Sequence, residues 1–167
     1  MVNLALLKSI KAFSGMSDEQ LASIRTHCEE LEFRKGVKLF KEGDVAAHLW
    51  HVIEGQVDLR FEMPDGRSSH PERTISSIEV KQQDAEARVL GWSCFIEPYR
   101  MRLSAYCVTD HCKIIRVPKD ALTDLFEENP TMGYKFLSYM IRVVGYRFHQ
   151  FQDHVAKNMG EDLMSGW

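Results

Sequence analysis

Long hydrophobic runs are absent from this sequence of 167 residues. No apolar stretch approaches the roughly 20 residues with which a helix crosses a bilayer. The start, MVNLALLKSIKAF, has neither a leading basic region nor a small-residue cleavage site of the kind that directs secretion. We therefore expect a cytoplasmic protein that makes no contact with a membrane.

Blocks of one charge sign are also absent, and the formal net charge is only −3. This balance disfavours a general nucleic-acid binder, which would carry a basic surface. Hydrophobic residues make up 44% of the chain and charged residues 27%, and both are ordinary values for a globular protein. We expect a single domain that spans residues 1–167 and folds around one core.

Cysteine is scarce, and no Cys-x-x-Cys pair occurs among Cys28, Cys94, Cys107 and Cys112. Without a secretion signal, we expect these thiols to be free and buried or partly buried. Cys107 and Cys112 flank the turn-like sequence VTDH, so they would face one another across a hairpin. A redox switch at this pair is the alternative interpretation.

The usual signatures of an enzyme are missing too, because no nucleophile stands beside a base and no phosphate-loop motif occurs. His48, His51 and Glu54 are the candidate metal ligands, but histidines three apart on a strand point to opposite faces. The adjacent His111 and Cys112 are the candidates for haem, yet no Cys-x-x-Cys-His attachment motif is present. We predict no catalysis, no metal and no cofactor.

Short β-branched or aromatic runs, separated by turn residues, dominate residues 31–117. They include VKLFKEGD, HLWHVIEGQVDLRFEM, RTISSIEV, LSAYCVTD and CKIIRV. Many short strands at close intervals predict a mainly β protein, an antiparallel jelly-roll β-barrel (double-stranded β-helix) with flanking helices. The polar stretch Asp65–Arg73 would be an exposed loop. Residues 1–30 predict short helices, since Ser17 and Gln20 have the spacing of a capping box.

Helices are also predicted for residues 118–160, where Pro118 opens one helix and Asn129 caps a longer one that begins at Pro130. In the longer helix, apolar residues alternate at spacings of three and four, which is the pattern of a coiled-coil seam. The seam consists of Tyr134, Leu137, Ile141, Val144, Phe148, Phe151 and Val155. A second apolar stripe beside it consists of Phe136, Met140 and Val143.

We expect the second stripe to pack on the barrel and the seam to pair with a second subunit in a homodimer. The alternative is that both stripes pack on the chain's own barrel. The regular heptad favours the homodimer, because it continues as far as Val155.

Two stretches give the chain a resemblance to the cyclic-nucleotide-binding domain family. This family is the regulatory module of the catabolite activator class and of cyclic-nucleotide-regulated kinases and channels. The first stretch, FRKGVKLFKEGDVAAHLWHVIEGQVDL, is similar to the family's first half in its glycines and apolar positions. The second, VLGWSCFIEPYRMRLSAYC, resembles the family's phosphate-binding cassette. The resemblance covers nearly the whole chain and implies a non-catalytic regulatory domain.

The cassette resemblance implies a site for a cyclic phosphate. A short helix over residues 93–97 would direct its first N–H groups at the anion, and the donors would be Ser93, Cys94 and Phe95. An arginine would add a charge-assisted contact, and alignment without gaps places it at Arg102. The implied ligand-binding residues are Gly91, Trp92, Ser93, Cys94, Phe95, Arg102, Leu103 and Ser104.

Three positions leave the nature of the ligand open. Arg100 is an alternative to Arg102, because a loop accommodates a shift of two residues. Trp92 stands directly after the glycine, where the family usually has a glutamate that accepts a hydrogen bond from the ribose hydroxyl. An indole donates one hydrogen bond and cannot accept one as a carboxylate does, so a site for the ribose hydroxyl loses much of its discrimination. Leu103 stands where the family often has a small or hydroxyl side chain.

The sequence therefore predicts a regulatory or sensor module that binds cyclic nucleotide weakly, or that binds another small phosphorylated or carboxylated ligand. A ligand-independent protein-interaction scaffold is the first alternative, with Trp92 filling the pocket. The sensor part of a larger transcription regulator is the second. The chain ends too soon after the seam to hold a helix-turn-helix, so we expect no direct binding to DNA.

Overall fold

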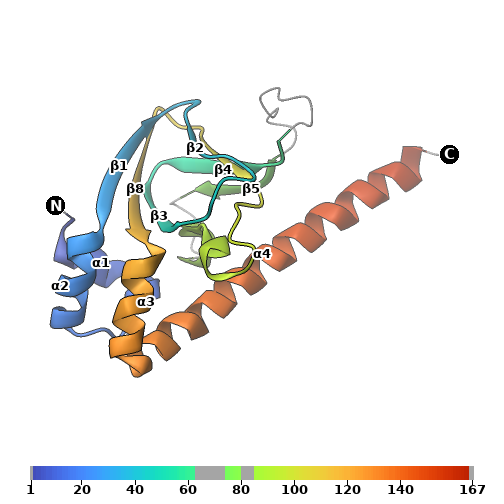
Figure 1. The fold of residues 1–167 in the computed structure, drawn as a ribbon. Coiled ribbons are helices and arrows are strands. Elements are labelled where there is room, and N and C mark those ends of the chain that lie inside the picture. The colour runs from blue at the N-terminus through green and yellow to red at the C-terminus, as the bar shows by residue number, and fades with distance from the viewer. Residues whose placement is uncertain (1, 63–73, 80–84, 166–167) are drawn as a thin grey trace.

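The computed structural model describes residues 2–62, 74–79 and 85–165, and it shows two antiparallel sheets flanked by helices (Figure 1). Sheet A has the strand order β1 (Glu29–Arg34), β8 (His111–Pro118), β3 (His48–Glu54) and β6 (Val89–Leu90). Sheet B has the strand order β2 (Lys38–Phe40), β7 (Ser104–Cys107), β4 (Gln56–Arg60) and β5 (Thr74–Glu79). The predicted class, mainly antiparallel β-structure with flanking helices, is confirmed. The predicted loop Asp65–Arg73 lies outside the described residues.

The two sheets are not closed into a barrel, and this corrects the predicted topology. Among the described residues, the strand ladders stay within one sheet or the other. The edge strands β2 and β6 have three and two residues, and each pairs only within its own sheet, β2 with β7 and β6 with β3. The chain instead changes sheet between consecutive strands, as it does from β3 to β4 and from β7 to β8. This double-sheet arrangement is that of a jelly roll.

Three short helices precede the first strand: α1 (Leu4–Ser9), the 3₁₀ helix η1 (Lys11–Phe13) and α2 (Asp18–His27). The predicted capping box is present at the start of α2. There the Ser17 hydroxyl accepts the N–H of Gln20, and the Gln20 side chain accepts the N–H of Ser17. The capping box thus fixes where α2 begins.

Two helices follow sheet A, α3 (Lys119–Glu128) and α4 (Pro130–Ser165). The side-chain oxygen of Asn129 accepts the N–H of Met132 at 3.1 Å, so Asn129 caps α4 as predicted. The C-terminal half of α4 extends well past the sheets (Figure 1). Within the part of the chain that the structure describes, no helix combines the length and the apolar character needed to cross a membrane.

The two apolar stripes of α4 have different surroundings. Phe136, Met140 and Val143 are buried, and the ring of Phe136 packs against that of Phe126 at 4.8 Å. The seam is largely exposed, with Tyr134 75% and Ile141 73% accessible. The alternative in which both stripes pack on the chain's own sheets is wrong for the exposed seam residues Tyr134 and Ile141, and pairing of the seam with a second subunit stays a prediction.

Candidate ligand-binding site

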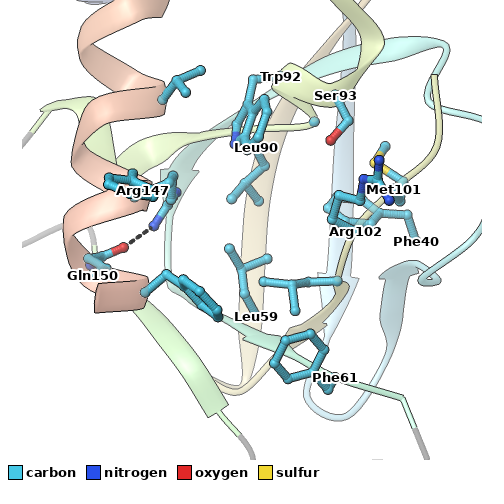
Figure 2. A pocket seen from close by; sticks show the side chains of 15 residues that line it. Phe40, Leu59, Phe61, Leu90, Trp92, Ser93, Met101, Arg102, Arg147 and Gln150 are labelled. Carbon is cyan, nitrogen blue, oxygen red and sulfur yellow. Dashed lines mark hydrogen bonds between the residues drawn. The ribbon is translucent and has the colours of Figure 1, made fainter. Parts of the chain in front are cut away.

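A cavity of about 310 Å³ lies between sheet B, the segment from β6 to β7, and the middle of α4 (Figure 2). This volume is at the lower end of the range for ligand pockets. Alternation along β4 directs Leu59 into the cavity, while Asp58 and Arg60 pair with each other at 2.9 Å. The lining residues are Phe40, Leu59, Phe61, Leu90, Gly91, Trp92, Ser93, Met101, Arg102, Leu103, Val144, Arg147, Phe148, Gln150 and Phe151.

Gly91 opens the predicted cassette in a left-handed conformation, with φ at 75°. A Cβ at this position would lie 2.6 Å from the carbonyl oxygen of His48 on β3, so only glycine fits here. The next residues form a 3₁₀ helix, η4 (Trp92–Phe95), in place of the helix predicted over residues 93–97. Gly91, Trp92 and Ser93 line the cavity, whereas Cys94 and Phe95 do not.

The predicted N–H donors are only partly available. The Cys94 N–H donates to the carbonyl oxygen of Gly91 at 2.9 Å, so the prediction that it faces an anion is wrong. The tight turn of a 3₁₀ helix uses this donor internally. The Phe95 ring packs edge-on against Phe136 at 5.7 Å, within the core. Burial raises the pKa of the Cys94 thiol to about 12, which keeps it protonated.

The two candidate arginines lie in different places. Arg102 lines the cavity, and it makes no hydrogen bond or ion pair with any residue that the structure describes. Arg100 is not part of the lining, and its guanidinium donates to the carbonyl oxygen of Gly43 at 3.1 Å. Of the two, only Arg102 is placed to meet a ligand in the cavity.

Leu103 and Ser104 point to opposite sides of the chain. Leu103 lines the cavity, but the Ser104 hydroxyl donates to Glu62 at 2.5 Å and accepts the N–H of Glu42 at 2.8 Å. Ser104 is the first residue of β7, and alternation places it on the same side of that strand as Tyr106. The structure therefore separates Ser104 from the other residues of the cassette.

Acidic side chains are absent from the lining among the described residues. Trp92, half-buried, lies where the family's glutamate is expected. The Ser93 side chain is directed at the cavity from the same side as Arg102 (Figure 2). The described lining thus offers donors to an anion but no carboxylate to a ribose hydroxyl.

Helix α4 supplies a second set of lining residues that the sequence did not indicate. Arg147 donates to the carbonyl oxygens of Ala87 and Val89, at 2.5 and 3.3 Å, and to the Gln150 side chain at 2.8 Å. Burial lowers the pKa of Arg147 to about 10, so it remains charged at neutral pH. These bonds hold α4 against the strand that leads into the cassette.

Three seam residues also face the cavity, namely Val144, Phe148 and Phe151. The seam predicted for a partner subunit and the wall of the cavity therefore overlap on one helix. Heptad spacing revealed the apolar positions, but it did not distinguish which of them face the chain's own sheets.

The other candidate sites find little support among the described residues, where no group of three metal-binding side chains comes together. His48 and His51 occupy opposite faces of β3, and burial lowers the pKa of His51 to about 4. The thiols of Cys107 and Cys112 are both free and buried. Burial, with the neighbouring Cys112 thiol, raises the pKa of Cys107 to about 12, which makes it a poor nucleophile.

Residues 30–129 match the family model of the cyclic nucleotide-binding domain. The chain belongs to the cyclic nucleotide-binding domain family. Apart from Glu29 at the start of β1, the matched range contains both sheets, the cassette with Arg102, and α3. The resemblance that the two sequence stretches indicated is confirmed.

Relatives of this cyclic nucleotide-binding domain are regulators and binding proteins. A CRP-like cAMP-activated global transcriptional regulator of Mycobacterium tuberculosis is 21% identical over 151 residues, which are 90% of this chain and 61% of the regulator. The chain therefore spans less than two thirds of that relative. A candidate cyclic nucleotide-binding protein from Geobacter metallireducens is 25% identical, with a TM-score of 0.71 over 89% of this chain and 100% of that one. A cyclic nucleotide-binding domain from Methylobacillus flagellatus is 19% identical, with a TM-score of 0.70 over 93% and 81% of the two chains.

Proposed function

We propose that this chain is a dimeric sensor module that binds a small anionic ligand in the cavity between sheet B and α4. The observation that carries the proposal is Arg102, which lines the cavity and has no partner among the described residues. A guanidinium presents several donors in a planar fork, and such a fork binds carboxylates and phosphates well. Apart from Arg147, whose donors serve backbone carbonyls and Gln150, no other charged residue is part of the described lining.

Cyclic AMP and cyclic GMP should be weak ligands of this cavity. Trp92 replaces the acceptor for the ribose hydroxyl, and no acidic side chain of the described lining takes over that role. A buried hydroxyl that loses its acceptor costs free energy, so affinity falls. We expect dissociation constants on the order of 100 μM or weaker, several kcal/mol short of nanomolar binding.

The seam on α4 supports the dimeric form. An exposed row of large apolar side chains on one helix face marks an interaction surface. Its heptad spacing fits a second copy of the same helix. Direct binding of this chain to DNA is not part of the proposal. The match covers 61% of the transcriptional regulator from Mycobacterium tuberculosis, so the sensor part of a larger regulator is the second candidate function.

Thermal denaturation with and without ligands tests the proposal, because a ligand that binds only the folded state raises the melting temperature. The panel contains cyclic AMP, cyclic GMP, inorganic phosphate, phosphate monoesters and organic acids. At least one anion should stabilise the wild type and the Arg100→Ala variant but not Arg102→Ala. Arg102→Ala should weaken that anion by about 1.5 to 3 kcal/mol, and Arg102→Lys should recover part of the loss.

Two results would count against the proposal. Sub-micromolar binding of either cyclic nucleotide in calorimetry would show that another group replaces the missing carboxylate. If no anion stabilises the chain through Arg102, the ligand-independent scaffold is the better description, with Trp92 filling the space of a ligand.

A further inference from the structure

We infer that the ligand is amphipathic, with one anionic head group held by Arg102 and an apolar body that fills the rest of the cavity. The inference rests on the proposed function and names the ligand class of the same site. A cavity of about 310 Å³ has room for about ten water-sized groups at ~30 Å³ each, so the whole ligand, head group and body, has on the order of ten non-hydrogen atoms. Medium-chain carboxylates and aryl-alkyl carboxylates have this form.

The unused polar groups of the cavity lie together on one side. Figure 2 shows Ser93 and Arg102 on one side of the cavity and Arg147 with Gln150 on the other. Ser93 is only 6% exposed, and its hydroxyl makes no hydrogen bond with the described residues. Ser93 and Arg102 are therefore suited to hold one head group, with a hydroxyl and a guanidinium as donors.

The polar groups on the opposite side are already engaged. Arg147 donates to the carbonyl oxygens of Ala87 and Val89 and to Gln150. The Gln150 amide also donates to the Tyr146 hydroxyl, at 3.0 Å. A ligand that recruited these groups would first have to break bonds that hold α4 in place. The opposite side of the cavity therefore favours contact with an apolar group over a second polar one.

Apolar side chains make up the surface between the two sides. Leu59 and Leu90 lie there in Figure 2, and Phe61, Phe148 and Phe151 complete the wall. A nucleotide base and a ribose carry several donors and acceptors, and each would be buried without a partner against this wall. An amphipathic acid carries its polar atoms at one end only, so it leaves none of them unpaired.

Calorimetry of the full chain with decanoate, octanoate, acetate and the uncharged decanol tests the inference. Each methylene that enters the cavity should tighten binding about fourfold, so decanoate should bind about fifteenfold more tightly than octanoate. Acetate should not bind at millimolar concentration, because it lacks the apolar body. Decanol should bind more weakly than decanoate, because it lacks the charge that Arg102 recognises.

Variants separate the head group from the body. Arg102→Ala should weaken decanoate about 10- to 100-fold and leave decanol unchanged, whereas Arg100→Ala should change neither. Leu103→Gln, at the half-buried wall, should weaken decanoate and decanol alike. Arg102→Glu should abolish decanoate binding and introduce binding of decylammonium. This change from binding decanoate to binding decylammonium would show that the variant is folded and that the side chain at position 102 contacts the charged head group.

Three outcomes would overturn the inference. Binding of decanoate that does not depend on Arg102 would place the head group elsewhere. Arg102-dependent binding of phosphate esters or cyclic nucleotides, with none of the fatty acids, would reject the apolar body but keep the proposed sensor function. Absence of any Arg102-dependent anion would reject both, since Arg102 carries the proposed function itself.

Discussion

Glu62, on the outer side of sheet B, accepts hydrogen bonds from Lys38 at 2.8 Å, Ser104 at 2.5 Å and Tyr106 at 2.8 Å. Burial alone would raise the pKa of Glu62, but these three donors outweigh it and lower the pKa to about 2. A carboxyl whose pKa falls on folding stabilises the protein above its ordinary pKa of 4.5, and this stabilisation is lost as pH falls toward 2. The cluster therefore makes the outer side of sheet B sensitive to acid.

Tyr106→Phe removes one of the donors and keeps the ring that Lys38 and Arg60 contact. We expect a loss of about 1.5 to 3 kcal/mol in the free energy of unfolding at pH 7, as for one hydrogen bond to a charged group. The loss should shrink only as pH falls toward 2, where Glu62 of the folded protein becomes protonated and no longer needs the donor. Urea titrations at several pH values measure this loss of stability. Tyr99→Phe is the control, because Tyr99 contacts Lys119 through its ring and the substitution keeps that ring. A loss that is the same at pH 2 and pH 7 would contradict this account.

Replacement of Gly91 by alanine should cost more free energy of unfolding than the added methyl group alone suggests. A Cβ there would lie 2.6 Å from the His48 carbonyl oxygen and 2.8 Å from Cδ1 of Trp50. Gly36 has a similar φ of 82° but no atom within 4 Å of a Cβ, so it is the matched control. Gly36→Ala should cost about 1 kcal/mol for the left-handed conformation, and Gly91→Ala about 1 to 3 kcal/mol more for the close contact. Equal losses in chemical denaturation would show that the cassette can move away from β3.

The sequence motif of the cassette predicted the position of some of its residues but not of others. The pattern placed Gly91, Trp92 and Arg102 at the cavity because the spacing from glycine to arginine is set by one short loop. It failed for Ser104, because the side of a strand to which a residue points depends on where the strand begins. It failed for the Cys94 N–H because the turn is a 3₁₀ helix, which uses that donor internally.

Helix α4 is the element for which sequence periodicity was most informative. A repeat of three and four residues predicted the exposed seam and the buried stripe, because both lie on fixed faces of one helix. The sequence pattern did not predict the position of Arg147 in the cavity wall, because a single charged residue beside apolar positions is usually a solvated side chain. Its role depends on carbonyl oxygens of residues 87 and 89, which only the folded chain brings within reach.

Neighbouring positions on α4 should respond very differently to truncation. Phe136 is fully buried and contacts the rings of Phe13, Phe95 and Phe126, whereas Leu137 is 47% exposed. Phe136→Ala should cost about 3 to 5 kcal/mol in the free energy of unfolding, because it leaves a cavity in the core. Leu137→Ala should cost less than about 1 kcal/mol in the monomer. Denaturant titration at low protein concentration compares them, and a large loss for Leu137→Ala would mean that the seam is covered within one chain.

Dimerisation and ligand binding are both predicted to use α4, because Val144, Phe148 and Phe151 belong both to the seam and to the cavity wall. A second subunit on the seam would cover Phe148, which is 58% exposed in the single chain, and would thereby close the outer side of the cavity. A ligand in the cavity should therefore bind more tightly to the dimer than to the monomer. By linkage, the same ligand should strengthen the dimer by an equal factor.

Ile141→Glu tests this coupling without touching the cavity, because Ile141 is 73% exposed and is not part of the lining. A charge in the apolar seam should give monomers of 19.3 kDa by light scattering at micromolar concentration, where the wild type should be a dimer. Ser138→Glu, an exposed position outside the seam, should leave the dimer intact. Decanoate should bind Ile141→Glu about fivefold or more weakly than it binds Ser138→Glu, the lower end of typical coupling between sites. A wild type that is already monomeric would refute the dimer, and equal affinities of the two variants would show that the seam and the cavity act independently.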